Sequence, residues 1–326
     1  MTQKPKVAFY WCASCGGCEE AVVDLAEAIL DVVAQVDIVF WPVALDFKRK
    51  DVEALPEGAI LATFLNGAIR TSEQEEMAHL LRRKSRLMIA FGSCSHTGGV
   101  PGLANLFRRE AILETVYRTT ASTVNPEGVL PQPESRYDGQ TLTLPVFDDS
   151  VRPLDQVVEV DYYLPGCAPT PKLVAQALGV LLSGDLPEKG SVLAPDRALC
   201  DECPRKASKP EKLALKAFRR SSEVIADPEQ CLLAQGLLCL GPVTRGGCEA
   251  LCVSGNMPCT GCFGPTSRVR DYGGKAISAI ASIVDSNDEE EIRRILEKIP
   301  DPTGTFYRYS LPASLLRRRR PDSAAA

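Results

Sequence analysis

Hydrophobic and polar positions follow two alternating periods along the first half of the chain. Short apolar runs, typical of buried strands, are separated by stretches in which apolar residues recur every three or four positions, as on one face of a helix. The runs that we interpret as strands are Val7–Trp11, Val36–Val43, Ala59–Ile69, Leu87–Phe91 and Val158–Leu164. Strands that alternate with helices predict an α/β fold, an open parallel sheet covered on both faces.

Helices are predicted between these strands from periodicity and from end signals. Apolar residues at helical spacing predict one helix over Glu19–Val33. Ser72 and Glu75 have the spacing of a capping box before a second helix, and a third is expected around Leu103–Val116. Thr170, a preferred N-cap residue, and Gly184 bracket the last helix of this region.

The pattern weakens in the rest of the chain. Thr119–Pro153 is rich in Pro, Thr, Ser, Gly and Asp and reads as a long insertion, and Leu186–Leu199 reads as a polar linker. Cys200–Pro265 has cysteines, glycines and prolines but little apolar periodicity, so we expect metal cross-links to stabilise it. Helices are expected again at Ala276–Val284 and Glu289–Ile299.

These changes divide the chain into four predicted parts. Residues 1–184 form the α/β domain, 185–199 a linker, 200–265 a metal-binding domain, and 266–326 C-terminal helices with a disordered basic tail around Arg317–Arg320.

Composition and charge narrow the class of protein. The chain has 326 residues, 45% of them hydrophobic, and a net charge of −5, so no basic field favours nucleic acid or an anionic membrane. No apolar run reaches the roughly 18 residues that a membrane span needs, and Met1–Lys6 lacks the features of a signal peptide. We therefore expect a cytoplasmic protein, whose cysteines are metal ligands or catalytic thiols rather than disulfides.

Twelve of the 13 cysteines sort into three sets of four. The first set is Cys15, Cys18, Cys94 and Cys167; the second set is Cys200, Cys203, Cys231 and Cys239; the third set is Cys248, Cys252, Cys259 and Cys262. Four thiolates are what a [4Fe–4S] cluster or a structural zinc requires. Three such sets in one chain favour a row of one-electron carriers.

The first set is scattered in sequence but consistent in position. Its cysteines follow three of the predicted strands, and the carboxyl ends of parallel strands share one edge of a sheet, where such folds bind ligands. Small residues should let the backbone approach a cluster closely, namely Gly16, Gly17, Gly98 and Gly99.

The second and third sets are denser and contain the chelating pairs Cys200-x2-Cys203 and Cys259-x2-Cys262. Zinc is the alternative, because two paired cysteines also make a zinc ribbon. The spacing differs from the two-cluster ferredoxin run of bacteria. Eight cysteines beside a third site on a sheet edge favour electron transfer over scaffolding.

Several motifs, taken together, resemble those of one protein family. They are Cys15-Gly-Gly-Cys18-Glu19-Glu20, Gly92-Ser-Cys94, Pro165-Gly-Cys167, Cys231-x7-Cys239-Leu-Gly-Pro242 and Met257-Pro-Cys259-Thr-Gly-Cys262. Over essentially residues 5–265 the chain resembles the small, electron-transferring subunit of cytosolic [NiFe] hydrogenases. It is most similar to the F420-non-reducing, or methyl-viologen-reducing, type associated with heterodisulfide reductase.

The resemblance implies a flavodoxin-like open parallel sheet with an irregular C-terminal iron–sulfur domain. It implies three [4Fe–4S] clusters, the first set holding the cluster nearest the nickel–iron site, the third set the medial cluster and the second set the distal one. The chain would be a non-catalytic electron-transfer subunit of an oxidoreductase that acts on H2. Its implied partners are the large subunit, a small iron–sulfur adaptor subunit and a heterodisulfide reductase-like complex.

The sequence departs from relatives at three cysteines. Many relatives have His where Cys200 stands and Pro near Cys252, so cysteine at both positions implies three complete four-cysteine sites. Cys12 forms a further Cys12-x2-Cys15 spacing and is either a spare thiol or an alternate ligand.

The remaining polar candidates have ordinary explanations beside functional ones. Glu19 and Glu20 open a helix, where carboxylates favour the helix dipole, and the resemblance places Glu20 near the subunit interface. His96 is expected to be a hydrogen-bonded loop residue, and His79 a surface residue. Two other interpretations stay open for the whole chain: a relay subunit related to those of respiratory complex I, and a zinc-stapled assembly scaffold.

Overall fold

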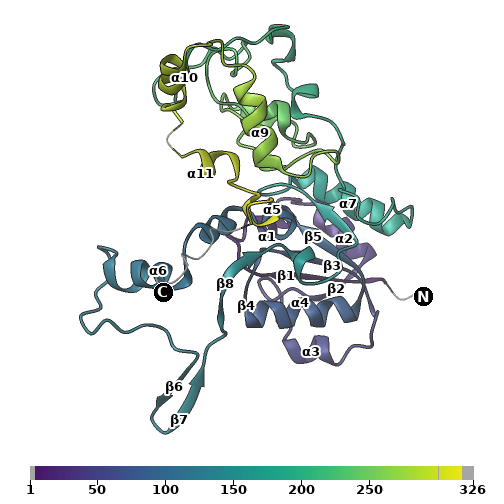
Figure 1. Cartoon of the computed structure of the whole chain (residues 1–326). Coiled ribbons are helices and arrows are strands. Elements are labelled where there is room, and N and C mark those ends of the chain that lie inside the picture. Colours follow the sequence, from purple (N-terminus) through teal and green to yellow (C-terminus); the bar gives the residue numbers. More distant parts are fainter. Residues whose placement is uncertain (1–3, 300, 318–326) are drawn as a thin grey trace.

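A five-stranded parallel sheet forms the centre of the computed structural model, which describes residues 4–299 and 301–317. Its strands are β1 (Lys6–Trp11), β2 (Asp37–Phe40), β3 (Ile60–Asn66), β5 (Ser85–Phe91) and β9 (Tyr162–Leu164). They are arranged in the order β2-β1-β3-β5-β9 (Figure 1). Counted within the sheet, this is the flavodoxin-like order 2-1-3-4-5. The predicted α/β class and open parallel sheet are confirmed.

Helices cover both faces of the sheet, because successive side chains of each strand point to opposite sides. Val7 and Phe9 of β1 belong to one buried core, whereas Ala8 belongs to the other. The first core includes residues of α1 (Gly17–Val23) and α7 (Pro171–Ser183), with α2 (Ala28–Gln35) packed on it; the second includes residues of α3 (Arg49–Glu53) and α4 (Ser72–Lys84). Phe9 stacks on Phe64 of β3, with ring centroids 5.0 Å apart.

Two predicted helix boundaries differ from the structure. The prediction of a single helix over Glu19–Val33 is wrong, because Ala26, between α1 and α2, adopts a left-handed conformation with φ 50°. The capping box is shifted by one residue: the Thr71 hydroxyl accepts a hydrogen bond from the Gln74 backbone N–H at 3.4 Å. The predicted end signals of α7, Thr170 and Gly184, are confirmed.

The predicted insertion forms an arm that projects from the body of the molecule (Figure 1). The predicted helix at Leu103–Val116 is instead a 3-10 segment followed by α6 (Arg109–Glu114). Beyond α6, β6 (Glu134–Tyr137) and β7 (Gln140–Thr143) pair as an antiparallel hairpin whose residues are all exposed. The chain returns through β8 (Phe147–Arg152), which pairs with β4 (Ile69–Thr71).

A separate buried core lies in the C-terminal part, built from residues between Leu199 and Leu311 and including Cys239 and Cys259. The α-helices described there are short, namely α8 (Leu251–Ser254), α9 (Tyr272–Ala281), α10 (Glu289–Leu296) and α11 (Pro302–Phe306), so loops carry most of this core. The division of the chain at residues 184, 199 and 265 stays a prediction. The predicted disordered tail lies largely outside the described residues.

The linker is held against the C-terminal part by one buried cation. Arg245 is 1% exposed, forms an ion pair with Asp196 at 3.0 Å, and donates to the carbonyl oxygens of Pro195 and Pro265 at 3.1 and 3.0 Å. The buried guanidinium thus has a partner in the linker and one in the C-terminal part, and it joins these two segments at one point. Within residues 4–299 and 301–317, no helix is long and apolar enough to cross a membrane.

Candidate metal centres

The first set converges at the carboxyl edge of the sheet, as the strand pattern predicts. Cys15 and Cys18 follow β1, Cys94 lies in α5 (Gly92–Thr97) directly after β5, and Cys167 follows β9. Burial raises the pKa of the Cys18 thiol, and the nearby Cys94, Cys167 and Cys15 raise it further. Burial also raises the pKa of Cys94 to about 12, again with contributions from Cys167 and Cys15. Thiols this close cannot all ionise unless a metal compensates their charge.

Two glycines leave room for the sulfurs of the first set. A Cβ atom on Gly92, at φ 82°, would lie 2.3 Å from the Cys18 sulfur; one on Gly99, at φ 57°, would lie 2.4 Å from the Cys94 sulfur. Gly99 thus lies against a sulfur of the first set, and its approach to a cluster stays a prediction, whereas the role of Gly92 was not predicted. The role becomes visible only when Cys18 packs beside β5, and these residues are far apart in sequence.

The other predicted glycines have different neighbours. A Cβ on Gly17 would lie 3.5 Å from the Cys15 sulfur, but one on Gly16 would meet the Trp11 ring at 3.2 Å. A Cβ on Gly98 would lie 2.3 Å from the Pro312 ring. The Gly99 backbone N–H also donates to the Tyr309 carbonyl at 3.1 Å, so the C-terminal segment clamps the loop that follows Cys94.

The second set lines a single cavity in the C-terminal part. Its four cysteines surround the cavity together with apolar side chains that include Leu199, Leu232 and Val253. Burial raises the pKa of Cys200 to about 11, Lys209 lowers it, and the other three thiols raise it. A largely apolar pocket with four convergent thiols suits a metal cluster that must be shielded from water.

The third set lies around α8 and the loop after it. Burial raises the pKa of Cys262 to about 12, with contributions from Cys248 and Cys252. Backbone N–H groups point at its sulfurs: Ala250 bonds to Cys248 and Gly261 bonds to Cys259. Such N–H···S bonds stabilise negative charge on cluster ligands and tune their potentials.

The third set lies between the other two. The backbone N–H of Cys167, a member of the first set, bonds to the Cys262 sulfur. At the other side, the backbone N–H of Cys259 donates to the Cys239 sulfur of the second set at 3.4 Å. Direct hydrogen bonds therefore join the sets in the spatial order first, third, second.

All twelve predicted residues thus lie in three groups, and the donor chemistry of each group fits an iron–sulfur cluster. In the described part of the chain, no three His, Cys, Asp or Glu side chains converge around the position of a single metal ion. The ligand assignment itself stays a prediction.

Cys12 lies apart from the first set. It is buried in the core on the α4 side of the sheet, with Ala8 and Phe40, whereas Cys18 is in the core on the α1 side. Burial, and to a lesser degree Glu73, raises the pKa of the Cys12 thiol. This placement favours the spare thiol over the alternate ligand.

Glu19 has a role that helix-dipole reasoning missed. It is 4% exposed, and its two carboxylate oxygens accept hydrogen bonds from the Trp41 indole and the Asn66 amide. Burial raises its pKa, and these two bonds lower it. Asn66 in turn accepts from the Ser14 hydroxyl at 3.2 Å, so the network fixes the loop that holds Cys15. Glu20, by contrast, is exposed.

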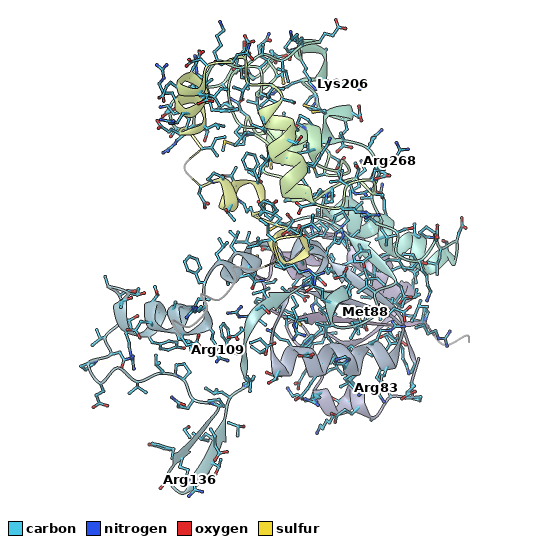
Figure 2. All side chains as sticks on the ribbon, viewed as in Figure 1. Arg83, Met88, Arg109, Arg136, Lys206 and Arg268 are labelled. Carbon is cyan, nitrogen blue, oxygen red and sulfur yellow. The ribbon has the colours of Figure 1, made fainter. Side chains whose placement is uncertain are left out.

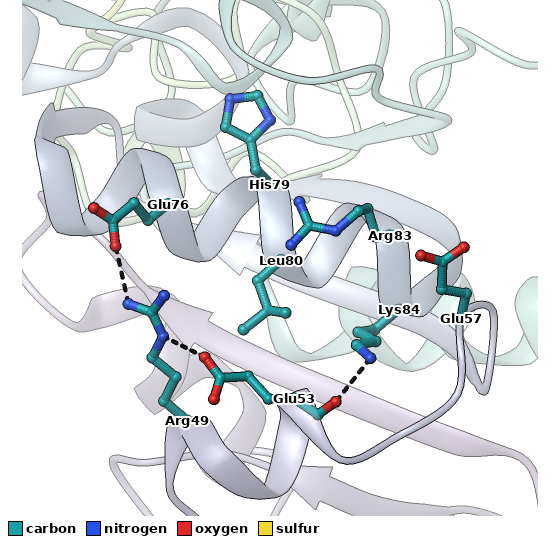
Figure 3. Close-up of a pocket in the computed structure, with 8 residues that line it drawn as sticks. All are labelled: Arg49, Glu53, Glu57, Glu76, His79, Leu80, Arg83 and Lys84. Carbon is teal, nitrogen blue, oxygen red and sulfur yellow. Dashed lines mark hydrogen bonds and ion pairs between the residues drawn. The ribbon is translucent and has the colours of Figure 1, made fainter.

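Neither histidine belongs to a cysteine set. His96 packs on the Tyr163 ring with centroids 4.6 Å apart, and burial lowers its pKa to about 4, with a smaller contribution from Arg245. His79 lines a charged surface groove between α3 and α4 (Figure 3). There Arg49 pairs with Glu53 at 2.9 Å and with Glu76 at 3.0 Å. No cysteine lines this groove, so we treat it as a solvated charged surface.

Comparison with known proteins agrees with this geometry. Residues 15–181 match the family described as NADH ubiquinone oxidoreductase, 20 Kd subunit. The chain is 43% identical over 317 residues to the iron-sulfur subunit of the F420-non-reducing hydrogenase of Archaeoglobus profundus, covering 96% of this chain and 98% of that protein. It is 37% identical over 320 residues to the corresponding F420-non-reducing hydrogenase subunit of Methanothermobacter thermautotrophicus, covering 97% of each.

Among solved structures, a chain of the [NiFeSe] hydrogenase from Desulfovibrio vulgaris Hildenborough shares the fold. The TM-score is 0.52 at 17% sequence identity, over 82% of this chain and 95% of that one. The matched 20 Kd subunit family accounts for the predicted likeness to complex I subunits, whereas the full-length relatives are hydrogenase subunits. The chain belongs to the family of iron–sulfur subunits of F420-non-reducing hydrogenases, the small subunits of oxidoreductases that act on H2.

Proposed function

We propose that this chain carries electrons between the nickel–iron site of a hydrogenase large subunit and a partner redox subunit, through three [4Fe–4S] clusters. The observation that carries the proposal is the row of cysteine sets, joined by the Cys167–Cys262 and Cys259–Cys239 hydrogen bonds. When bound, the clusters supply one-electron carriage. The first set, at the exposed Cys15 and Cys167, faces the large subunit, and the second set is the far end of the row.

The chain's own residues hold and insulate the clusters. Cysteine thiolates are the ligands, Gly92 and Gly99 let the backbone approach the first set, and Leu199 and Leu232 exclude water from the second set. Backbone N–H groups to the sulfurs lower the energy of the added negative charge. We further propose a cytoplasmic complex with a small iron–sulfur adaptor subunit and a heterodisulfide reductase-like partner.

Anaerobic purification of the native complex tests this function. Iron, acid-labile sulfide, nickel and zinc are counted in one sample, and co-purifying subunits are identified by mass spectrometry. We expect about 12 iron and about 12 sulfide ions per copy of this chain, beyond those on partner subunits, because three cubane clusters hold four of each. We also expect nickel on a co-purifying large subunit. If no heterodisulfide reductase-like subunit co-purifies, that partner is wrong, but the relay function stands.

A complex I-like relay is the second candidate, favoured by the match of residues 15–181 to the 20 Kd subunit family. It predicts the same iron and sulfide without nickel. Zinc in place of iron would contradict both relays and support the scaffold.

A further inference from the structure

Four cations from three segments of the C-terminal part line one open hollow of about 420 Å³. They are Arg219, Arg220, Lys298 and Arg308. One acidic side chain, the half-exposed Glu223, lies near these cations, with its Oε1 atom 3.9 Å from the Lys298 Nζ atom. The hollow is therefore positively charged, although the whole chain carries a net charge of −5.

The floor of the hollow is apolar and adjoins two cysteine sets. Phe218, Leu240 and Pro258 line it together with Cys259 of the third set. Leu240 follows Cys239 of the second set directly, and the Cys259 N–H donates to the Cys239 sulfur at 3.4 Å. The hollow thus opens the protein surface at the place where the second and third sets meet.

The positive charge extends along the chain beside the second set. Residues 205–220 contain seven Lys or Arg and one acid, Glu211. Lys209 lines the cavity of the second set, and the exposed Lys206 lies in the C-terminal part at the opposite end of the molecule from Arg83 (Figure 2). The net charge of the chain hides this asymmetry.

We propose that this basic hollow docks an acidic electron-carrier protein. An apolar floor next to a redox centre, ringed by one sign of charge, suits transient docking of a protein whose own centre lies under an acidic surface, because complementary charge speeds encounter and fixes orientation. Each H2 cleaved by the large subunit supplies two electrons, which reduce two molecules of a one-electron carrier and release two protons. The proposal rests on the proposed relay function.

The test uses the purified holo-complex with H2 as donor and two acceptors. An acidic plant-type [2Fe–2S] ferredoxin is the protein probe, and methyl viologen is the small acceptor that reports on the relay itself. The double variant Arg220→Glu/Lys298→Glu is compared with Lys50→Glu/Arg83→Glu, which changes net charge equally on the exposed surface around α3 and α4. The KM for ferredoxin is measured in both variants and the parent.

We expect the KM for ferredoxin to rise about tenfold or more in Arg220→Glu/Lys298→Glu and to stay near the parent value in the control. In the parent, raising ionic strength from about 0.05 to about 0.5 M should also raise this KM, because salt screens surface charge. An unchanged KM in Arg220→Glu/Lys298→Glu, with viologen reduction intact, would overturn the docking proposal. A parent complex that cannot reduce viologen from H2 would instead overturn the relay function.

Discussion

At the scale of single residues, the first set depends on two glycines without side chains as much as on its four thiols. Gly92 and Gly99 adopt positive φ angles and leave the volume that the Cys18 and Cys94 sulfurs occupy. Any side chain there meets both a backbone penalty and a steric one. The two penalties can be separated because the chain has another glycine with positive φ and open surroundings.

Gly99→Ala should release the metal of the first set. Its Cβ would lie 2.4 Å from the Cys94 sulfur, so the loop must move. The matched control is Gly139→Ala at the hairpin tip, where φ is 75° and nothing lies within 4 Å of the added Cβ. The control carries only the left-handed penalty of about 1–2 kcal/mol. Iron per chain should fall by about a third in Gly99→Ala alone; equal iron in both variants would show that the loop relaxes.

Glu19→Ala should destabilise the protein by about 1–3 kcal/mol, because the buried Trp41 and Asn66 donors lose their acceptor. Glu19→Gln keeps one acceptor oxygen and should lose less. The free energy of unfolding of both variants, and the electron paramagnetic resonance spectrum of the reduced first-set cluster, are the measurements. A spectrum altered in Glu19→Ala and restored in Glu19→Gln would identify Glu19 as a positioning residue; equal stability in all three proteins would contradict the network.

At the scale of elements, the arm is fastened to the body at its root. Glu75 of α4 accepts from Arg152 of β8 at 2.7 Å, and Arg152 also pairs with Asp148 at 3.0 Å. Beyond this root, the β6–β7 hairpin contributes no buried residue. Two-stranded hairpins are only marginally stable alone, so the arm depends on contacts at its root, where the ion pair adds to the pairing of β8 with β4.

The Glu75–Arg152 pair should make the root of the arm sensitive to acid. The hydrogen bond from Arg152 lowers the pKa of Glu75, so the native state binds fewer protons than the unfolded state and gains stability above the ordinary glutamate pKa of about 4.3. This gain is lost as pH falls through the lowered native value. Glu75→Gln should therefore be less stable than the parent at pH 7, and the difference should disappear as pH falls through the lowered native pKa of Glu75. Stability curves that stay parallel from pH 7 to pH 3 would contradict the linkage.

At the scale of the whole molecule, two parts depend on metal to different degrees. The sheet has two apolar cores of its own, whereas the C-terminal core is carried mostly by loops and contains Cys239 and Cys259. Chelation of iron should therefore remove protection from residues 199–311 before it affects β3 and β5. Hydrogen exchange of the holo- and chelated protein measures this, with β3 amides as the internal control. Protection retained throughout 199–311 after complete iron loss would contradict metal-dependent folding.

The sequence predicted what depends on local pattern and missed what depends on distant contacts. Strand–helix alternation was enough for the parallel sheet, and the positions of Cys15, Cys94 and Cys167 after predicted strands were enough to expect them at one sheet edge. The break at Ala26 escaped because apolar periodicity continues through Leu30 and Val33, which the structure leaves exposed. The basic hollow escaped because Arg219, Lys298 and Arg308 come from separate segments, and a net charge averages over all of them.

The contacts that hold the first-set loop also bear on when this loop can be completed during translation. Tyr309 accepts from the Gly99 N–H and the Thr97 hydroxyl, and Pro312 packs against Gly98, so the loop after Cys94 is completed by residues near the end of the chain. During translation the N-terminal region emerges first, yet this loop lacks its support until residue 312 has left the ribosome. We therefore expect a chain truncated before Tyr309 to hold metal at the first set less firmly, because Cys94 would then lie in a loop without these contacts.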